Sequence, residues 1–520
     1  MNTLNKLIPF DLAHGVITKA RSGGKTIVQC HGTFDLIHPG HIVHFEEAKA
    51  LGDILVVTIT DENNVNKGPG RPFFNDQLRA QSISALSFVD FVVLIPFPSA
   101  VEAIECIRPD IYCKGLEYKN DENDVTGNIL DDRSTVENLG GQISYVGSVV
   151  FSSTRLLNNH FSTQTQPTKQ FCREVAKAYG NDGFREAVES FRNLNVLVVG
   201  DIIFDRYTNV SVQGLTSKNR ILSTRFISDD LQAGGALAVV RHLKEFASNI
   251  KLVSILGNES WVDDEVRKYI GPDEDHILRV PNFTSIIKQR FVEPKIRSGH
   301  SGLHHNELSK LFSVNYIDQQ QPIEKIQQIV IKRIGEQIKD ADLVLVMDFG
   351  HGVMEPLVRE FVQENAKFLA LNCQTNSNNY GFNLINNNYI RADSFSLDQT
   401  EISLALGKRE MNFEMELEAL RENLKSKYAW LTRGGDETIG AHKSKESVHC
   451  PSFESNVVDP IGAGDAFCSI ASMAAAKGLP LKLSTFMAQL AGAQAVKIIG
   501  NSESISKSRL LKSAEAMLNF

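Results

Sequence analysis

Two stretches of this sequence alternate short runs of β-branched residues with amphipathic helical patterns. In the first stretch, the apolar runs at residues 26–30, 54–59 and 91–95 are typical of buried strands. The segments between them space their apolar residues three and four apart, as helices do. Strands that alternate with helices in this way predict a parallel sheet with helices on its faces, so the predicted fold class is α/β.

A second alternation begins at residues 195–200, recurs at 343–348 and closes with helical patterns up to residue 499. Between the two stretches the chain is first polar and then mixed in character. We therefore expect a first α/β domain over residues 1–160, a linker over 161–193 and a second α/β domain over 194–520. The polar, β-like stretch at 220–228 predicts a small β lid over a pocket of the second domain.

Composition excludes several classes of protein. The chain has 520 residues, 42% of them apolar, which is ordinary globular usage, and its net charge of −8 provides no basic surface for nucleic acid or an anionic membrane. No run of 18 apolar residues occurs, and the first residues lack the apolar core of a signal peptide. Seven cysteines without a CxxC pair are typical of reduced thiols. We expect a cytoplasmic protein that binds neither nucleic acid nor a membrane.

Residues 30–41 connect the first predicted strand to the first predicted helix and contain a Pro39-Gly40 turn flanked by His38 and His41. In parallel sheets, ligands bind outside the carboxyl ends of strands, where a helix N-terminus offers free N–H groups to phosphate. Two histidines at this point can stabilise the charge that develops on an attacked α-phosphate. Two other interpretations stay open: a simple turn with chance histidines, or a metal site formed by His31, His38, His41 and His44.

The second motif is Gly462-Ala463-Gly464-Asp465, which precedes a predicted apolar helix. Small residues allow the backbone N–H groups at the start of this helix to approach a phosphoryl group, and Asp465 can accept a proton from an attacking hydroxyl. This pattern is typical of phosphoryl transfer. The alternative is a glycine-rich turn whose aspartate only caps the helix.

The order of motifs in the first domain resembles that of the cytidylyltransferase-like nucleotidyltransferases, over most of residues 26–157. The matching motifs include Gly32 to Asp35, His38 with His41, Arg79, Lys114-Gly115 and Ser152-Ser153-Thr154. The resemblance implies a Rossmann-like fold in which His38 and His41 are catalytic and bind a triphosphate near the backbone of Thr33 and Phe34. It also implies a catalytic Lys114, with Arg79, Ser152, Ser153 and Thr154 binding the nucleotide or its phosphates.

An insert rich in Asp and Asn, residues 117–137, separates Lys114 from the last predicted strand of the first domain. Two interpretations stay open for it. It is either a surface loop or a segment that shapes the side of the site at which a sugar phosphate binds.

The second domain resembles the ribokinase (PfkB) family of sugar kinases over about residues 195–505. The motifs that carry the resemblance are Gly200-Asp201, Gly234-Gly235-Ala236, residues 347–352, residues 432–435 and Gly462 to Asp465. The resemblance implies that Asp465 is the catalytic base, that Gly462, Ala463 and Gly464 form an anion hole, and that Asp205, Gly234 and Gly235 contact the sugar. It further implies that Glu401 helps to hold Mg²⁺ and that a homodimer forms through the β lid.

Three positions depart from the pattern of that family. Ala238 stands where an asparagine is usual, Asp398 replaces the asparagine of an Asn-x-x-Glu motif, and Pro460-Ile461 replaces two threonines. An altered sugar specificity explains these changes as readily as a loss of kinase activity.

Together the two domains resemble bifunctional enzymes of ADP-heptose synthesis, with the domain order inverted. The expected reactions are ATP-dependent phosphorylation of a sugar phosphate at its anomeric hydroxyl, followed by nucleotidyl transfer from ATP or CTP to the sugar 1-phosphate, with Mg²⁺ as cofactor. The alternative is a polyol- or glycerol-phosphate cytidylyltransferase with a kinase-like regulatory or dimerisation domain.

Overall fold

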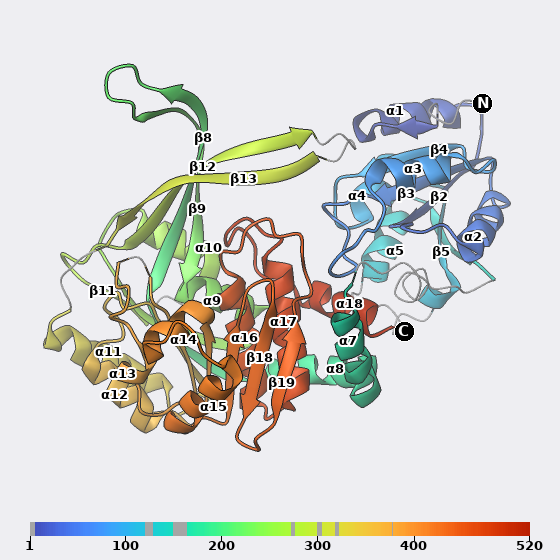
Figure 1. The fold of residues 1–520 in the computed structure, drawn as a ribbon. Coiled ribbons are helices and arrows are strands. Elements are labelled where there is room, and N and C mark those ends of the chain that lie inside the picture. The colour runs from blue at the N-terminus through green and yellow to red at the C-terminus, as the bar shows by residue number, and fades with distance from the viewer. Residues whose placement is uncertain are drawn as a thin grey trace. The chain divides into compact units, whose positions relative to one another are not determined.

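The computed structural model describes residues 6–119, 128–148, 164–271, 276–298, 304–317, 322–376 and 378–519. The chain forms two compact units (Figure 1). Residues 1–164 and 511–520 make up the first unit, and residues 165–510 make up the second. Within the described ranges, no helix is both long and apolar enough to cross a membrane.

The first unit is built on a six-stranded, entirely parallel sheet with the strand order β1-β4-β3-β2-β5-β6. Its strands are β1 (Leu7–Ile8), β2 (Ile27–Gly32), β3 (Ile54–Thr60), β4 (Phe91–Ile95), β5 (Ile111–Gly115) and β6 (Gln142–Val146). Its helices are α1 (Phe10–Arg21), α2 (Pro39–Lys49), α3 (Asp76–Ser84), α4 (Val101–Ile107) and α5 (Asn128–Asn138). The strand order reverses between β2 and β5, which is where ligands bind in open α/β sheets.

Both faces of this sheet are buried, which explains why its strands are almost continuously apolar. Along β2, Val28 and Cys30 belong to the core on one face, whereas Ile27 belongs to the core on the other. Every residue of β3 is buried. The predicted parallel α/β fold of the first domain is confirmed.

The second unit contains a nine-stranded sheet with the order β11-β10-β7-β14-β15-β16-β17-β18-β19. Its strands are β7 (Asn195–Gly200), β10 (Asn249–Leu256), β11 (Ile277–Arg279), β14 (Leu343–Asp348), β15 (Leu369–Cys373), β16 (Ser394–Asp398), β17 (Tyr428–Thr432), β18 (Glu437–His442) and β19 (Ser447–Pro451). The sheet is parallel except for β18 and β19. The predicted α/β class of the second domain is confirmed.

Helices on both sides of this sheet complete the second unit. They are α7 (Gln166–Ala178), α8 (Gly180–Glu189), α9 (Ala236–Lys244), α10 (Val262–Ile270), α11 (Glu324–Gln337), α12 (Pro356–Asn365), α13 (Ile385–Asn388), α14 (Gln399–Leu406), α15 (Phe413–Asn423), α16 (Ala463–Ala476) and α17 (Leu481–Ala495). The division between the units falls within α18 (Lys507–Leu518). Two of these helices, α7 and α8, occupy most of the predicted linker, and α7 contacts β19 and α17.

A separate four-stranded sheet, with the order β13-β12-β8-β9, belongs to the second unit. Its strands β8 (Ile202–Leu215), β9 (Leu222–Gly235), β12 (Ile286–Ser298) and β13 (His304–Tyr316) are the longest in the chain's described part. Figure 1 shows them as long arrows that stand apart from the nine-stranded sheet. This extra sheet is larger than the small lid predicted around residues 220–228, because β12 and β13 join it.

Candidate active sites

The first candidate site lies at the carboxyl ends of β2 and β5, where the strand order reverses. Thr33 and Phe34 directly follow β2, and Phe34 adopts a left-handed backbone conformation with φ of 45°. Its ring folds back against Gly32, where a Cβ atom would lie 3.0 Å from the ring. The motif therefore needs glycine at position 32 because the Phe34 ring occupies that space.

His38 and His41 lie at the start of α2. His38 caps the helix by accepting a 3.4 Å hydrogen bond from the backbone N–H of His41, and the two imidazole rings stack with centroids 3.8 Å apart. Burial lowers the pKa of His41 to about 3 and also lowers the pKa of His38. Within the described residues, His41 Nδ1 is buried and has no hydrogen-bond partner. Neutral imidazoles retain one N–H donor each, so this pair can donate to phosphate oxygens.

The metal-site interpretation gains no support from the described residues. His31 lies in β2, and its ring nitrogens are 3.0 Å from Thr58 Oγ1 and 3.2 Å from Thr60 Oγ1 in β3. Burial lowers the pKa of His31 to about 3. In the part of the chain that the structure describes, no three His, Cys, Asp or Glu side chains form a group that could hold a metal ion.

Arg79 is fully buried and does not reach the surface of the site. Its guanidinium donates a 2.7 Å hydrogen bond to the carbonyl of Thr33 and pairs with Asp76 at 2.5 Å. Asp35 fixes the same loop from the other side, because it accepts hydrogen bonds from the backbone N–H groups of Phe73 and Phe74. This geometry ties Arg79 to the loop that follows β2, and the nucleotide contact expected of Arg79 stays a prediction.

Lys114 ends β5 and forms an ion pair with Asp132 of α5, with 2.8 Å between Nζ and Oδ2. Its Nζ also lies 5.4 Å from the ring centroid of Tyr112 and 5.6 Å from that of Tyr118. The sequence predicted Lys114 but not its partner, since nothing in the 117–137 insert distinguishes Asp132 from its acidic neighbours. Ser152, Ser153 and Thr154 lie outside the described residues.

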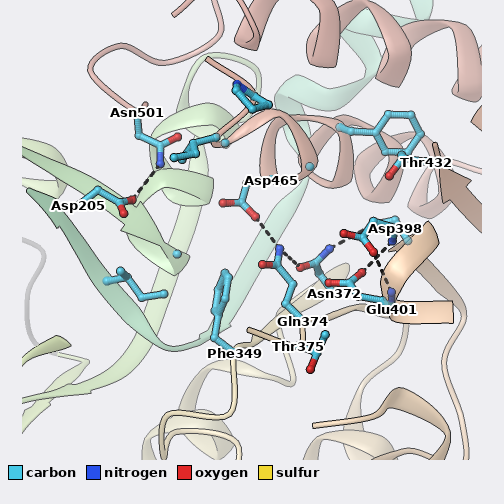
Figure 2. A pocket seen from close by; sticks show the side chains of 18 of the residues that line it. Asp205, Phe349, Asn372, Gln374, Thr375, Asp398, Glu401, Thr432, Asp465 and Asn501 are labelled. Atoms are coloured by element: carbon cyan, nitrogen blue, oxygen red, sulfur yellow. Dashed lines mark hydrogen bonds between the residues drawn. The ribbon is translucent and has the colours of Figure 1, made fainter. Parts of the chain in front are cut away.

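The second candidate site is a cavity of about 290 Å³ in the second unit. Its walls come from the N-terminus of α16, from the ends of β15, β16 and β17, and from β8 and β12 of the extra sheet. Figure 2 shows Asp465 near the centre, with Asp205 and Asn501 on one side and Asp398 and Glu401 on the other. The structure therefore brings the predicted base, sugar-binding carboxylate and metal ligand into one cavity.

Asp465 lies in the first turn of α16. Burial raises the pKa of its carboxyl group to about 7, although the hydrogen bond from Gln374 and the charge of Lys288 oppose this shift. Gln374 Nε2 is 3.0 Å from Asp465 Oδ1 and 2.7 Å from the side-chain oxygen of Asn372. A carboxylate with a pKa near neutral pH suits a general base.

Of the two glycines before Asp465, the surrounding structure requires glycine at position 462 but not at position 464. Gly462 has φ of 84°, and a Cβ atom there would lie 2.2 Å from Asn501 Oδ1, so both the backbone and the space demand glycine. Gly464 has open space around its Cα. Both glycines line the cavity at the N-terminus of α16, as an anion hole requires.

Gly234 and Gly235 end β9 beside Asp205. A Cβ atom at Gly234 would lie 2.4 Å from Asp205 Oδ2, and Gly235 has φ of 56°. The carboxylate of Asp205 forms an ion pair with Arg290, and Asn501 Nδ2 lies 3.4 Å from its Oδ2. The glycines therefore let the backbone approach a carboxylate that is already held by a cation and an amide.

Sequence reasoning missed Lys288, Arg290 and Asn501, which all line this cavity. Lys288 and Arg290 lie on β12, where Lys288 pairs in register with Asp205 of β8. Lys288 is partly buried, and its Nζ lies 5.6 Å from the Phe349 ring. Burial lowers its pKa. No local motif marks these residues, because only the pairing of β8 with β12 brings them to the cavity.

The residues around Glu401 fit a magnesium ion by their chemistry. Asp398 caps α14 by accepting a 2.7 Å hydrogen bond from the backbone N–H of Glu401, and Glu401 accepts one of 2.8 Å from the backbone of Asp398. Asparagine and aspartate are equivalent helix caps, so the substitution at Asp398 preserves this turn. Burial raises the pKa of Glu401 well above its usual value. With the nearby Asn372, these groups offer the oxygen ligands that Mg²⁺ prefers.

Comparison with known proteins assigns families to both parts of the chain. The cytidylyltransferase-like family matches residues 30–157, and the pfkB family of carbohydrate kinases matches residues 391–508. The bifunctional protein HldE of Desulfatibacillum aliphaticivorans is 38% identical over 157 residues, which are 30% of this chain and 31% of that protein. HldE of Hyphomonas neptunium is 39% identical over 150 residues, or 28% and 29% of the two chains. The chain thus spans about a third of the length of these relatives, over the nucleotidyltransferase part.

Solved structures resemble the second unit at low sequence identity. Phosphofructokinase-2 from Escherichia coli is 12% identical with a TM-score of 0.48 and covers 62% of this chain and 99% of its own. Ribokinase from Arabidopsis thaliana is 18% identical with a TM-score of 0.46 and covers 63% and 99%. The two family matches show a cytidylyltransferase-like domain at the N-terminal end of the chain and a pfkB carbohydrate kinase domain at its C-terminal end.

Proposed function

We propose that this protein is a bifunctional enzyme of nucleotide-activated sugar synthesis. Its second unit transfers the γ-phosphoryl group of ATP to the anomeric hydroxyl of a sugar phosphate, and heptose 7-phosphate is the first substrate to test. Its first unit then joins the sugar 1-phosphate to a nucleotidyl group from ATP or CTP. The observation that carries the proposal is the cavity that combines Asp465, the N-terminus of α16 and the cation Lys288.

In the kinase step, Asp465 accepts the proton of the anomeric hydroxyl while the sugar oxygen attacks the γ-phosphorus and ADP leaves. The backbone N–H groups at Gly462 to Gly464 stabilise the negative charge on the transferred group, since they lie at the positive end of the α16 dipole. Glu401 and Asp398 would hold Mg²⁺, which would supply positive charge against the triphosphate. Gln374 orients the Asp465 carboxylate through its 3.0 Å hydrogen bond.

The charges of β12 support a substrate that carries a phosphate. Arg290 is already paired with Asp205, whereas no described carboxylate lies within ion-pair distance of Lys288 Nζ. Burial lowers the pKa of Lys288 even though the charges of Asp205 and Asp465 oppose this shift, so a further anion beside the lysine would lower the free energy of its charged form. A neutral sugar would not supply that anion, so the pocket favours a phosphorylated sugar.

The departures from the family pattern are compatible with an active kinase. Asp398 keeps its capping role, and the loop that holds Pro460 is anchored by the fully buried Asp459. That carboxylate accepts hydrogen bonds from the Tyr207 hydroxyl at 2.8 Å and from the backbone N–H of Gly500 at 3.0 Å. These contacts hold the start of the glycine motif in place without the usual threonines.

In the nucleotidyl-transfer step, an oxygen of the sugar 1-phosphate attacks the α-phosphorus of the triphosphate, and pyrophosphate leaves. His38 and His41 donate N–H groups to phosphate oxygens, and Lys114 adds positive charge from β5. No covalent intermediate with the protein is needed. By analogy with the matched families, we place this chemistry in the cytoplasm and expect a homodimer that forms through the four-stranded sheet.

The test is a product screen. The purified chain is incubated with Mg²⁺, with heptose 7-phosphate, heptose 1,7-bisphosphate or a polyol phosphate such as glycerol 3-phosphate, and with ATP, CTP or GTP in turn, and mass spectrometry identifies the products. ADP with a heptose bisphosphate, followed by an NDP-heptose, supports the proposal and identifies the nucleotide. Transfer from CTP to a polyol phosphate without any kinase product supports the cytidylyltransferase alternative instead. Asp465→Asn and His41→Ala chains serve as controls for the two steps.

A further inference from the structure

A carboxylate lies in the middle of the apolar face of α5. Ile129, Asp132 and Val136 are three and four residues apart, so they share one face of the helix, and each is at most 1% exposed. Val136 packs in a small core with Ala100, Ile104 and Tyr112. An aliphatic side chain at position 132 would fit this pattern, and a buried carboxylate is expensive unless it is paired. The packing of α5 therefore does not explain Asp132.

The contacts of Asp132 lead to the first candidate site. Its Oδ2 lies 2.8 Å from Lys114 Nζ and accepts a 3.2 Å hydrogen bond from the Tyr112 hydroxyl. Tyr112 and Lys114 are two residues apart on β5, so they project from the same face of the sheet. Asp132 Oδ1 is buried and forms no hydrogen bond with any residue that the structure describes. The carboxylate thus bonds to two side chains of β5, and Lys114 is the charged one of the two.

Lys114 lies near the carboxyl end of β5, where the strand order of the sheet reverses. β5 lies beside β2, with Cys113 in register with Cys30, so Lys114 and His31 are neighbours at the carboxyl edge of the sheet. The charge of Lys114 contributes to the lowered pKa of His31, after burial as the main cause. A long lysine side chain samples many rotamers, and an ion pair with a buried carboxylate removes that freedom before the substrate binds.

We propose that Asp132, contributed by the insert, is a positioning residue for nucleotidyl transfer: it fixes Lys114 Nζ at the triphosphate site. The proposal rests on the proposed function of the first unit. In this proposal α5 contributes the carboxylate, so this part of the insert acts on the triphosphate side of the site rather than on the side at which a sugar phosphate binds. Asp132 itself need not touch the substrate.

The test compares two neighbouring aspartates on α5. Asp132→Asn keeps the volume and removes the charge, and Asp131→Asn makes the same change on the exposed face of the helix. We expect Asp132→Asn to lower kcat for nucleotidyl transfer at least tenfold, while Asp131→Asn leaves it unchanged. The kinase activity of the second unit, measured on the same preparations, should be unaffected and shows that the rest of the chain is intact.

A double variant separates positioning from simple stabilisation. If Asp132 acts through Lys114, then Lys114→Ala and the Lys114→Ala/Asp132→Asn chain should have the same residual transfer rate, because the two losses do not add. Additive losses, or a rate for Asp132→Asn within threefold of that for Asp131→Asn, would overturn the proposal. If Asp132→Asn unfolds the first unit, the Asp132→Leu variant is tested in its place, since an aliphatic residue fits the apolar face of α5. A folded Asp132→Leu chain with full transfer activity would also overturn the proposal.

A binding measurement keeps this inference distinct from the proposed function. The shift of the first unit's melting transition on addition of MgATP or MgCTP reports triphosphate binding without turnover. If the unmodified chain shows the shift but no transfer, the proposed function fails, and a smaller shift for Asp132→Asn than for Asp131→Asn still supports the inference. If the unmodified chain shows neither, both proposals are refuted.

Discussion

The two glycines of the α16 motif should respond in opposite ways to the same added methyl group. At Gly462, alanine must adopt φ of 84°, which costs about 1–2 kcal/mol for a residue with a Cβ atom. The new methyl would also lie 2.2 Å from Asn501 Oδ1, so Asn501 has to move and loses its 3.4 Å hydrogen bond to Asp205, worth about 1 kcal/mol. Gly462→Ala therefore distorts the loop and the neighbouring sugar-binding carboxylate together.

If this distortion of about 2–3 kcal/mol is expressed in the transition state, Gly462→Ala lowers kcat/KM of the kinase about 30- to 160-fold. It also lowers the melting temperature of the second unit. Gly464→Ala is the matched control for stability, because it adds a methyl group in open space within the first turn of α16. An alanine in a helix is more stable than a glycine by about 0.5–1 kcal/mol, so this variant should melt at a higher temperature than the unmodified chain.

Steady-state kinase assays and scanning calorimetry check both variants. A second substitution isolates the steric part: Asn501→Ala removes the atoms that the new methyl meets, so the Gly462→Ala/Asn501→Ala chain should lose less activity than the two single losses combined. The strain from the positive φ remains in the double variant. A Gly462→Ala chain with kinase activity within threefold of the unmodified chain, or two alanine variants with the same change in melting temperature, would refute the reasoning.

Three further predictions concern charge at the two sites. The kinase rate should rise with pH until about pH 7 and then level off, because the base Asp465 must be deprotonated and its pKa is about 7. Lys288→Met should move this rise to higher pH, since the charge of Lys288 lowers the pKa of Asp465. The same variant should raise KM for the sugar phosphate more than KM for ATP. Asp465→Asn should lower kcat by about 10²–10⁴ while raising the melting temperature of the second unit. The raised pKa means that the ionised carboxylate destabilises the folded state increasingly from about pH 4 to pH 7, so this gain should be larger at pH 8 than at pH 5 when measured by calorimetry. His41→Ala should remove nucleotidyl transfer and leave the kinase rate unchanged, and a loss of both activities in a folded chain would contradict two independent sites.

The strands and the motif turns could be predicted because their signals are local. The apolar runs at 54–59 and 91–95 correspond to β3 and β4 within one residue at each end, since both strands are buried on two faces. The turns before α2 and α16 could be predicted because glycine and proline directly before a helical pattern are signals that a sequence shows locally. Such signals depend on residues adjacent in sequence.

The strands β12 and β13 of the lid and the cations on β12 could not be predicted, because they depend on pairing between distant strands. β12 and β13 carry mixed polar and charged residues without a clean alternation, so their strand character is visible only when β12 pairs with β8. Lys288 enters the cavity because it lies in register with Asp205, 83 positions earlier in the chain. Asp132 could not be predicted for a different reason. In the sequence of α5 it cannot be distinguished from the exposed Asp131, and only the contacts with β5 show that Asp132 is buried.

Several buried carboxylates in and near the second candidate site make the folded state less stable when they are ionised. Burial raises the pKa of Asp465 in the cavity to about 7. It does the same for Asp201, which does not line the cavity and accepts three backbone hydrogen bonds, from Phe349, His351 and Val353. The pKa of Glu401 is raised as well, by burial and by the charge of Asp398. Each of these shifts means that the protein would be more stable with a proton or a cation beside the carboxylate. A magnesium–nucleotide complex would bring a cation to the carboxylates and a sugar phosphate would bring a further anion to Lys288, so the two substrates together would offset these buried charges. This balance predicts that the two substrates stabilise the second unit more together than the sum of their separate effects.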